Sequence, residues 1–324
     1  MALNRKPLTE VTDEQIEAYA RDGAVVVPNV FDKEWMVETL RPVMNRLVIE
    51  REDMGLLPHI PNRYMSRTIP EVRSLIFDSA LAEVAGKVLQ SKEIRFFFEE
   101  MFAKPPKSDD KTIWHVDRMG WPVSRESTMI PSLWMPIYPV TKANSMECVA
   151  GSHTQDVPYW LFSPNVLQMK KLYGLERPDD RPGHPNCEPL RDDPNATILS
   201  WNMDPGDLLI IHPWVLHYSG GNPNNEWRMA ISARVFGDDV RWDPRVDCLN
   251  LAGVSFDEMI PGQRPSGTMF PLLWSEDGRR DTDEAFPRGF ATSWSSESDE
   301  QNDFNAYDDF KQLSKTAYPG HWKA

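Results

Sequence analysis

The first part of the chain carries the periodicity of helices. Thr12 and Gln15 have the spacing of a capping box, in which the Thr hydroxyl accepts a hydrogen bond from the third helical amide while the Gln side chain reaches back. A short helix is therefore expected to about Arg21, with Gly23 as a natural end. The β-branched run Ala24–Val27, which is closed by a proline, predicts a strand directly after this helix.

A second and longer helix is predicted from Lys33 to about Glu50. Asp32 can cap its N-terminus. One side of it carries an apolar stripe at helical spacing, made of Trp35, Met36, Leu40, Val43, Leu47 and Val48. Residues 70–91 predict one or two further helices, so the N-terminal part of the chain is expected to brace the remainder of the fold.

From about Glu93 the pattern changes to that of strands. Runs of apolar and β-branched residues predict strands at 94–103, 133–140, 198–201, 207–212 and 229–236. Helices first, followed by widely spaced strands with long loops, predict a mostly β fold with flanking helices. The expected architecture is a double-stranded β-helix, a barrel of the jelly-roll or cupin-like type.

We expect one domain over residues 1–275. The segment 154–196 is rich in Pro, Asp and Asn and has little periodicity, which predicts a lid-like insertion, because long loops in compact domains often cover binding sites. After about residue 276 the chain turns polar. Residues 276–324 are therefore expected to form a polar C-terminal extension.

The charge balance limits the possible partners. The 324 residues carry a formal net charge of -14, and an acidic surface repels nucleic-acid phosphates and anionic lipid. The start of the chain lacks the apolar segment of a secretory signal, and no stretch approaches the about 18 apolar residues of a membrane span. Three cysteines without a CxxC pair disfavour a disulfide scaffold and a thiolate zinc site. We expect a cytoplasmic protein, monomeric or homodimeric, whose partner is a small molecule.

The most informative stretch is Trp114-His115-Val116-Asp117. Side chains alternate between the faces of an extended segment, so His115 and Asp117 point the same way. One imidazole and one carboxylate supply two of the three ligands of a facial triad, which is diagnostic of non-haem iron(II) oxygenases. An HxD pair alone is a weak signal, so a third ligand is needed from a distant strand.

His212 and His217 compete for that third position. The strand that comes after them places Arg228, Ala230, Ser232 and Arg234 on one face. The small side chains between the two arginines leave room for a ligand beside a guanidinium. Arg is the side chain best matched to a carboxylate, which it binds with two parallel hydrogen bonds.

The run GDLLIIHPWVLHYSGGN, continued by WRMAIS, resembles the C-terminal signature of the phytanoyl-CoA dioxygenase-like family of iron(II)- and 2-oxoglutarate-dependent oxygenases. The resemblance implies that His217 is the third metal ligand. It also implies that Arg228, eleven residues further on, binds the distal carboxylate of 2-oxoglutarate, and that Ser219 touches the same co-substrate.

Other motifs of that family occur in the same order over residues 9–240. The segment LWMPIYPVTKANSMECVAGSH implies that Trp134 lies near 2-oxoglutarate. Two positions depart from the family pattern. Ser145 stands where a glycine is usual, and Tyr218 comes after the metal-binding histidine where a glycine is common. Neither position belongs to the expected metal ligands.

The substrate pocket is expected to involve Met119 and Trp121, which come directly after the HxD, together with Trp201 and Arg234. Core packing is the alternative for Trp121, and a salt bridge is the alternative for Arg234. Lys104 is expected to be a charge at a strand end. No separate acid or base residue is assigned, because the metal centre itself would be the catalytic group.

The expected function is therefore that of a 2-oxoglutarate-dependent dioxygenase, with Fe(2+), 2-oxoglutarate and O2. It would hydroxylate or otherwise oxidise a small-molecule metabolite, as in natural-product biosynthesis. Asp117 argues against halogenation, because halogenases of this class lack the carboxylate. Two alternatives remain open. One is a non-catalytic small-molecule-binding protein on the same barrel. The other is a zinc- or manganese-dependent hydrolase or isomerase, which would need a nearby general base.

Overall fold

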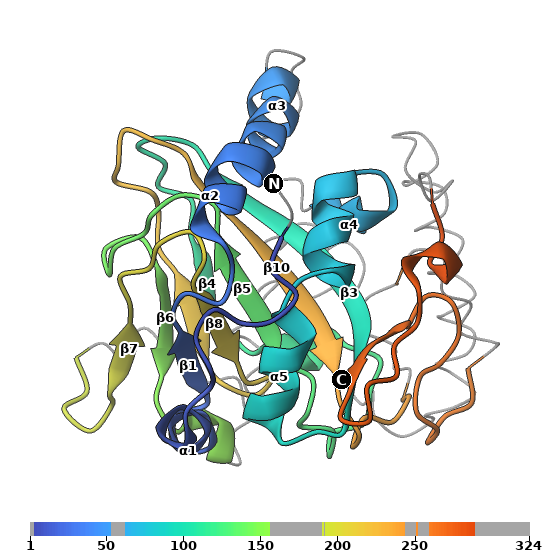
Figure 1. Cartoon of the computed structure of the whole chain (residues 1–324). Helices are drawn as coiled ribbons and strands as arrows, with labels where there is room; N and C mark the ends of the chain where they lie inside the picture. Colours follow the sequence, from blue (N-terminus) through green and yellow to red (C-terminus); the bar gives the residue numbers. More distant parts are fainter. Residues whose placement is uncertain are drawn as a thin grey trace, which may run out of the picture.

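Two antiparallel β-sheets form the centre of the molecule (Figure 1). The computed structural model describes residues 3–52, 62–155, 190, 192–243, 251 and 259–288. Within these residues the larger sheet has 7 strands in the order β1-β8-β5-β10-β3-β11, with β2 paired to β3. The smaller sheet has 4 strands in the order β4-β9-β6-β7. The predicted fold class, a jelly roll with flanking helices, is confirmed.

The strands fall close to the predicted segments. Their bounds are β1 Ala24–Val27, β2 Asn62–Arg63, β3 Glu93–Lys104, β4 Thr112–His115, β5 Ser132–Pro136, β6 Met146–Val149, β7 Ile198–Ser200, β8 Leu208–Ile211, β9 His217–Ser219, β10 Arg228–Phe236 and β11 Leu272–Ser275. The strand predicted at 133–140 ends earlier, at Pro136. The prolines at 136 and 139 have no N–H to donate to a neighbouring strand, which ends regular pairing there.

The helices also agree with the sequence pattern. They are α1 Asp13–Asp22, α2 Lys33–Trp35, the π-helical segment Met36–Leu40, α3 Arg41–Glu52, α4 Pro70–Phe77 and α5 Leu81–Leu89, with short 3-10 turns at Met65–Arg67, Asp117–Gly120, Ser152–Thr154 and Asp283–Ala285. The capping box at Thr12 and Gln15 is present, and Gly23 ends α1 with φ 79. A φ in this left-handed region favours glycine.

The long helix predicted from Lys33 is interrupted by the π-helical segment Met36–Leu40. Pro42 lies just after this segment, in the first turn of α3. A proline inside a helix has no N–H and its ring clashes with the carbonyl four residues earlier, here that of Glu38. The wider π turn gives the ring the space it needs, so the helix continues past the proline.

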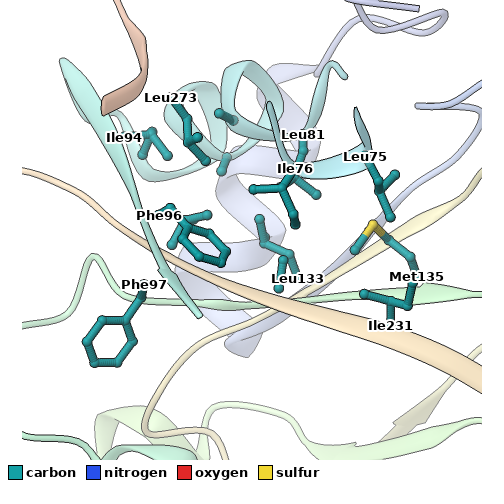
Figure 2. Packing of buried hydrophobic residues seen from close by; sticks show 14 of the residues in the cluster. Leu75, Ile76, Leu81, Ile94, Phe96, Phe97, Leu133, Met135, Ile231 and Leu273 are labelled. Atoms are coloured by element: carbon teal, nitrogen blue, oxygen red, sulfur yellow. The ribbon is translucent and has the colours of Figure 1, made fainter. Parts of the chain in front are cut away.

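The main hydrophobic core lies between the helices and one face of the larger sheet (Figure 2). Side chains of α4 and α5 meet side chains of β3, β5 and β10, and the buried residues drawn include Leu75, Ile76, Leu81, Phe96, Leu133, Met135 and Ile231. Full burial of each such side chain stabilises the fold by about 1.5–3 kcal/mol. The other face of the same strands is left to line the space that faces the smaller sheet.

The C-terminal segment, residues 259–288, packs against this core. β11 pairs with β3, and the ring of Phe286 lies 5.3 Å from the rings of both Phe77 and Phe96. Arg73 of α4 makes an ion pair of 2.7 Å with Asp283 and also donates to the Phe286 carbonyl. The first residues after 275 are thus packed against the helical layer.

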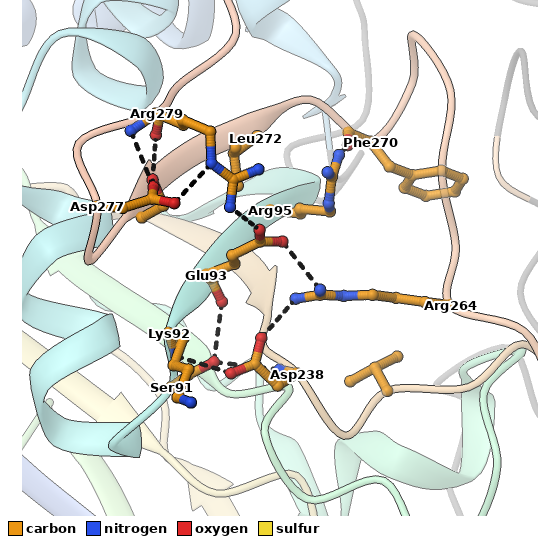
Figure 3. A network of polar contacts seen from close by, with 12 residues as sticks. Ser91, Lys92, Glu93, Arg95, Asp238, Arg264, Phe270, Leu272, Asp277 and Arg279 are labelled. Carbon is orange, nitrogen blue, oxygen red and sulfur yellow. Dashed lines mark hydrogen bonds and ion pairs between the residues drawn. The ribbon is translucent and has the colours of Figure 1, made fainter.

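A polar network fastens the same segment to the start of β3 (Figure 3). Glu93 accepts from Arg264 at 2.9 Å and from Arg279 at 2.8 Å, and Arg264 also pairs with Asp238 at 2.9 Å. Partly exposed ion pairs contribute about 0–1 kcal/mol each. The network therefore fixes the path of the segment more than it stabilises the fold.

Some expectations fall outside the described residues. Most of the lid-like insertion at 154–196, the remainder of the polar extension beyond residue 288, and two of the cysteines, Cys187 and Cys248, lie there. Cys148 is buried and free. Among the helices that the structure describes, none combines the length and the apolar character needed to cross a membrane.

We predict that Phe286→Ala lowers the free energy of unfolding by about 3–5 kcal/mol, because it leaves a cavity between two phenyl rings. Urea unfolding followed by circular dichroism measures the change. Leu8→Ala is the control, since Leu8 is 58% exposed, and its effect should stay within about 0.5 kcal/mol. If Phe286→Ala lowered the free energy of unfolding no more than Leu8→Ala does, the C-terminal segment would not pack against these rings.

Candidate functional site

Two strands of the smaller sheet place the predicted histidines opposite each other. His115 ends β4, His217 begins β9, and the two residues are direct partners in the antiparallel pairing. Their rings are 4.1 Å apart between centroids. This juxtaposition brings together side chains about a hundred positions apart in sequence, as the metal hypothesis requires.

Asp117 completes the cluster. It opens the 3-10 turn after β4, and its Oδ1 lies 3.7 Å from Nε2 of His115 and 3.8 Å from Nε2 of His217. One ligand atom from each of the three residues lies within 4.8 Å of the others. Two imidazoles and one carboxylate fit a divalent iron with open positions for further ligands.

The protonation states also suit metal binding. Nδ1 of His217 lies 3.0 Å from the Val215 carbonyl, so it carries the proton and leaves the Nε2 lone pair toward Asp117. Burial, with His115 nearby, lowers the pKa of His217 to about 4. Burial on its own raises the pKa of Asp117, but the neighbouring histidines and Arg234 outweigh it, so that this pKa lies well below its ordinary value. Near neutral pH the imidazole of His217 is neutral and the carboxylate is ionised, which are the ligating forms.

The second oxygen of Asp117 is held by another residue. The Ser132 hydroxyl donates to Oδ2 at 2.5 Å, and Nη2 of Arg234 lies 4.0 Å from the same oxygen. Ser132 and Arg234 are partners in the pairing of β5 and β10. The carboxylate is therefore oriented with Oδ1 toward the two imidazoles and Oδ2 toward the larger sheet.

Arg228 lies at the start of β10 and is 2% exposed. Its guanidinium lies 5.0 Å above the Trp134 ring, and Nε donates to the Asn144 carbonyl at 3.2 Å. No carboxylate of a described residue lies within ion-pair distance of it. Burial lowers its pKa to about 10, so it remains a cation, and a buried cation without a counterion calls for an anionic ligand.

Lys104 is a residue whose importance the sequence did not indicate. It ends β3 as predicted, but it is 6% exposed and is the direct pairing partner of Arg228. Its Nζ donates to the Ser219 carbonyl at 3.0 Å, the Ser219 hydroxyl at 3.1 Å and the Gly220 carbonyl at 2.6 Å. Ser219, predicted to touch 2-oxoglutarate, thus lies beside Lys104, which in turn pairs with Arg228. Only the register between β3 and β10 reveals this, and no local pattern encodes it.

The residues predicted to line the substrate pocket lie in different parts of the structure. Arg234 makes an ion pair of 3.0 Å with Glu100, which is the salt-bridge alternative for this residue. Trp121 is buried in the main core, with ring contacts to Phe97 and Phe98. Trp201 is partly buried against the cluster that contains Trp134. The side chain of Met119 lies outside what the structure describes. The substrate roles of these residues stay predictions.

The competing histidine, His212, is placed elsewhere. Its ring lies 4.7 Å from His153 and 5.8 Å from Tyr19, and its Nδ1 accepts from the Trp214 amide at 3.2 Å. Burial lowers its pKa to about 3. It is a packed neutral histidine and does not join the group of three ligand residues.

Comparison with known families identifies the chain. The sequence matches the phytanoyl-CoA dioxygenase (PhyH) family over residues 19–230. This is well over half of the chain, so the protein belongs to that family, and the resemblance drawn from its motifs is confirmed. Comparison with curated protein sequences gives no match.

Solved structures share the fold. The non-haem α-ketoglutarate-dependent carbocyclase SnoK from nogalamycin biosynthesis aligns with a TM-score of 0.59 at 20% identity, over 84% of this chain and 100% of its own. The epimerase SnoN, in complex with Fe3+, α-ketoglutarate and nogalamycin RO, aligns with 0.57 at 20% identity, over 81% and 98%. EctD from S. alaskensis, with 2-oxoglutarate and 5-hydroxyectoine, aligns with 0.56 at 17% identity, over 89% and 95%. Identities this low establish the common architecture alone.

We predict that Ser132→Ala weakens binding of a divalent metal by about 10- to 100-fold, because Asp117 loses the hydroxyl that orients it. Anaerobic calorimetry with Fe(II) or Mn(II) measures the affinity. Ser145→Ala is the matched control, since that hydroxyl is also buried but has no hydrogen-bond partner among the described residues. The metal affinity of this variant should equal that of the wild type. Equal affinities for both variants would show that Ser132 does not support the ligand.

Proposed function

We propose that this protein is an iron(II)- and 2-oxoglutarate-dependent dioxygenase that oxidises a C–H bond of a small-molecule metabolite. The observation that carries the proposal is the cluster of His115, Asp117 and His217 between two sheets, together with Arg228, which is buried at the start of β10 and has no described carboxylate as a partner. A metal site and a separate buried carboxylate-binding cation are the two features that a bidentate keto-diacid requires. Membership of the family supports the same conclusion.

His115, Asp117 and His217 would hold the iron in this proposal. When bound, iron(II) supplies the redox chemistry that couples the conversion of 2-oxoglutarate and O2 into succinate and CO2 to oxidation of the substrate. The chain contributes the geometry of that site. The pairing of β4 with β9 sets the separation of the two imidazoles, and Ser132 keeps one oxygen of Asp117 directed toward them.

Arg228 would bind the distal carboxylate of 2-oxoglutarate. Its Nε is held by the Asn144 carbonyl and its central carbon lies over the Trp134 ring. The guanidinium is therefore preorganised, and little side-chain freedom is lost on binding. Ser219 would donate its hydroxyl to the same carboxylate. Burial of these groups excludes water, which strengthens each charged hydrogen bond.

The class of substrate is inferred from the side chains near the metal site and from proteins of the same fold. The rings of Phe98 and Phe102 face the same side of β3 as Glu100, with Arg234 over both rings, so the space beside the metal is partly aromatic. SnoK and SnoN act in nogalamycin biosynthesis, and they favour a natural-product substrate here as well. Their names describe a carbocyclase and an epimerase, so the outcome of the oxidation, hydroxylation or another C–H reaction, would depend on how the substrate is held. The low cysteine content favours a cytoplasmic setting.

The two alternatives have less support. A zinc or manganese hydrolase needs a free general base, and Glu100, on the inward face of β3, is instead paired with both Arg63 and Arg234. A purely binding protein would have no use for a full set of three metal-binding side chains together with their orienting serine. Succinate release in the presence of O2 separates these alternatives from the oxygenase.

We predict that anaerobic addition of 2-oxoglutarate to the Fe(II)-loaded protein produces a weak visible charge-transfer band. His115→Ala should abolish the band, because a metal ligand is lost. Arg228→Ala should keep the band but raise the 2-oxoglutarate concentration required by about 30-fold or more, because a buried charged partner is removed.

Arg241→Ala provides the control for the arginine variant. Arg241 is exposed and donates to nearby carbonyls on the surface, so its removal should leave the titration unchanged. A wild-type protein that binds Fe(II) but develops no band with 2-oxoglutarate would overturn the proposed function.

A further inference from the structure

Two buried basic side chains lie side by side with no counterion among the residues that the structure describes. Lys104 and Arg228 are direct partners on β3 and β10, and each is at most 6% exposed. Neither makes an ion pair with any described carboxylate. Burying one unpaired charge is costly, and placing two of them together adds mutual repulsion. Binding of an anion at this place would relieve both costs.

The hydrogen bonds of Lys104 determine how the Ser219 hydroxyl is oriented. An ammonium group has three protons and no acceptor, and the three acceptors here are the Ser219 carbonyl, the Ser219 hydroxyl oxygen and the Gly220 carbonyl. Because the Ser219 oxygen accepts from Lys104, the hydrogen of that hydroxyl is free to be donated elsewhere. Lys104 thereby converts Ser219 into a donor for an anion.

We propose that Lys104 is a positioning residue of the 2-oxoglutarate site, which holds the Ser219 hydroxyl as a donor and adds a second positive charge beside Arg228 for the distal carboxylate. This inference rests on the proposed function. In this arrangement the distal carboxylate of 2-oxoglutarate would face two cations and one hydroxyl donor. Lys104 itself need not touch the co-substrate, since it acts through Ser219 and through its charge.

Binding of 2-oxoglutarate is expected to be coupled to protonation of Lys104. Burial and the neighbouring Arg228 lower the pKa of Lys104 to about 7, and Asp110 acts in the opposite direction. From β9 and the residue after it, the lysine contacts the neutral Ser219 and Gly220. A carboxylate entering the site favours the charged form and raises this pKa, so binding takes up a proton whenever the pH lies above the pKa of the free protein. Affinity for 2-oxoglutarate should accordingly fall as the pH rises above about 7.

Calorimetry of 2-oxoglutarate binding to the anaerobic Fe(II) protein tests the proposal. At pH 8, titrations in buffers of different ionisation enthalpy should give an uptake of up to one proton for the wild type. Lys104→Met should bind roughly 10- to 100-fold more weakly and take up no proton at this site. Lys104→Arg, which keeps the charge at every pH, should recover part of the affinity without proton uptake.

The controls separate this inference from the proposed function. Lys107→Met removes an exposed lysine three positions away, whose Nζ donates to the Pro223 carbonyl, and this variant should behave as the wild type. Unchanged Fe(II) affinity in Lys104→Met verifies that the metal centre is intact. A wild type that does not bind 2-oxoglutarate overturns the proposed function itself.

The inference alone is overturned in two ways, both with the wild type binding 2-oxoglutarate normally. The first is an unchanged affinity and proton uptake in Lys104→Met. The second applies even if that variant does not fold: a wild type that takes up no proton at pH 8 excludes a lysine charged by the co-substrate.

Discussion

The alternation of side chains along β10 is the constraint on which the rest of the structure depends. Arg228, Ala230, Ser232 and Arg234 face the space between the sheets, whereas Met229, Ile231 and Ala233 face the helical core. Every residue of the strand is buried, so neither face tolerates the side chains of the other. If the pairing register of β10 shifted by one residue, the guanidinium groups would be buried against the helices and the apolar side chains would enter the site. Pairing with β3 on one side and β5 on the other prevents that shift.

Some of the buried charges within the barrel are paired with another described residue and others are not. This difference connects the candidate site to the stability of the fold. Arg234 makes an ion pair with Glu100, whereas Lys104 and Arg228 have no carboxylate partner within the described part of the chain. An uncompensated buried ion costs several kcal/mol, so the free protein carries a cost that its ligands relieve. A metal and a dicarboxylate that bind only the folded state would add their binding free energy to the stability of the fold. The same groups that prepare the site for a ligand therefore weaken the empty protein.

The sequence predicted those parts of the site that depend on local geometry. The period of an extended chain was enough to place His115 and Asp117 on one face, and Arg228 with Arg234 on another. The choice of His217 over His212 needed the resemblance to a family, because both histidines flank the same turn. Lys104 and the pair of Arg234 with Glu100 depend on which residues of β3 lie opposite which residues of β10. These strands are more than a hundred residues apart, and no periodicity within either strand specifies their register. The π-helical segment before Pro42 is a similar case, since the proline predicts a disturbance but not its form.

The return of the chain to β3 and α4 near its far end has a consequence for synthesis. The ring of Phe286 closes the gap between Phe77 and Phe96, and Asp283 satisfies the buried Arg73. On the ribosome, the helices and the first long strand emerge some two hundred residues before these partners exist. Until then the rings of Phe77 and Phe96 lack this neighbour and Arg73 lacks its counterion. Exposed apolar surface of this kind is the condition under which nascent chains aggregate or recruit chaperones. Completion of the helical layer is thus a late event, timed by translation of the C-terminal segment and not by the order of the strands.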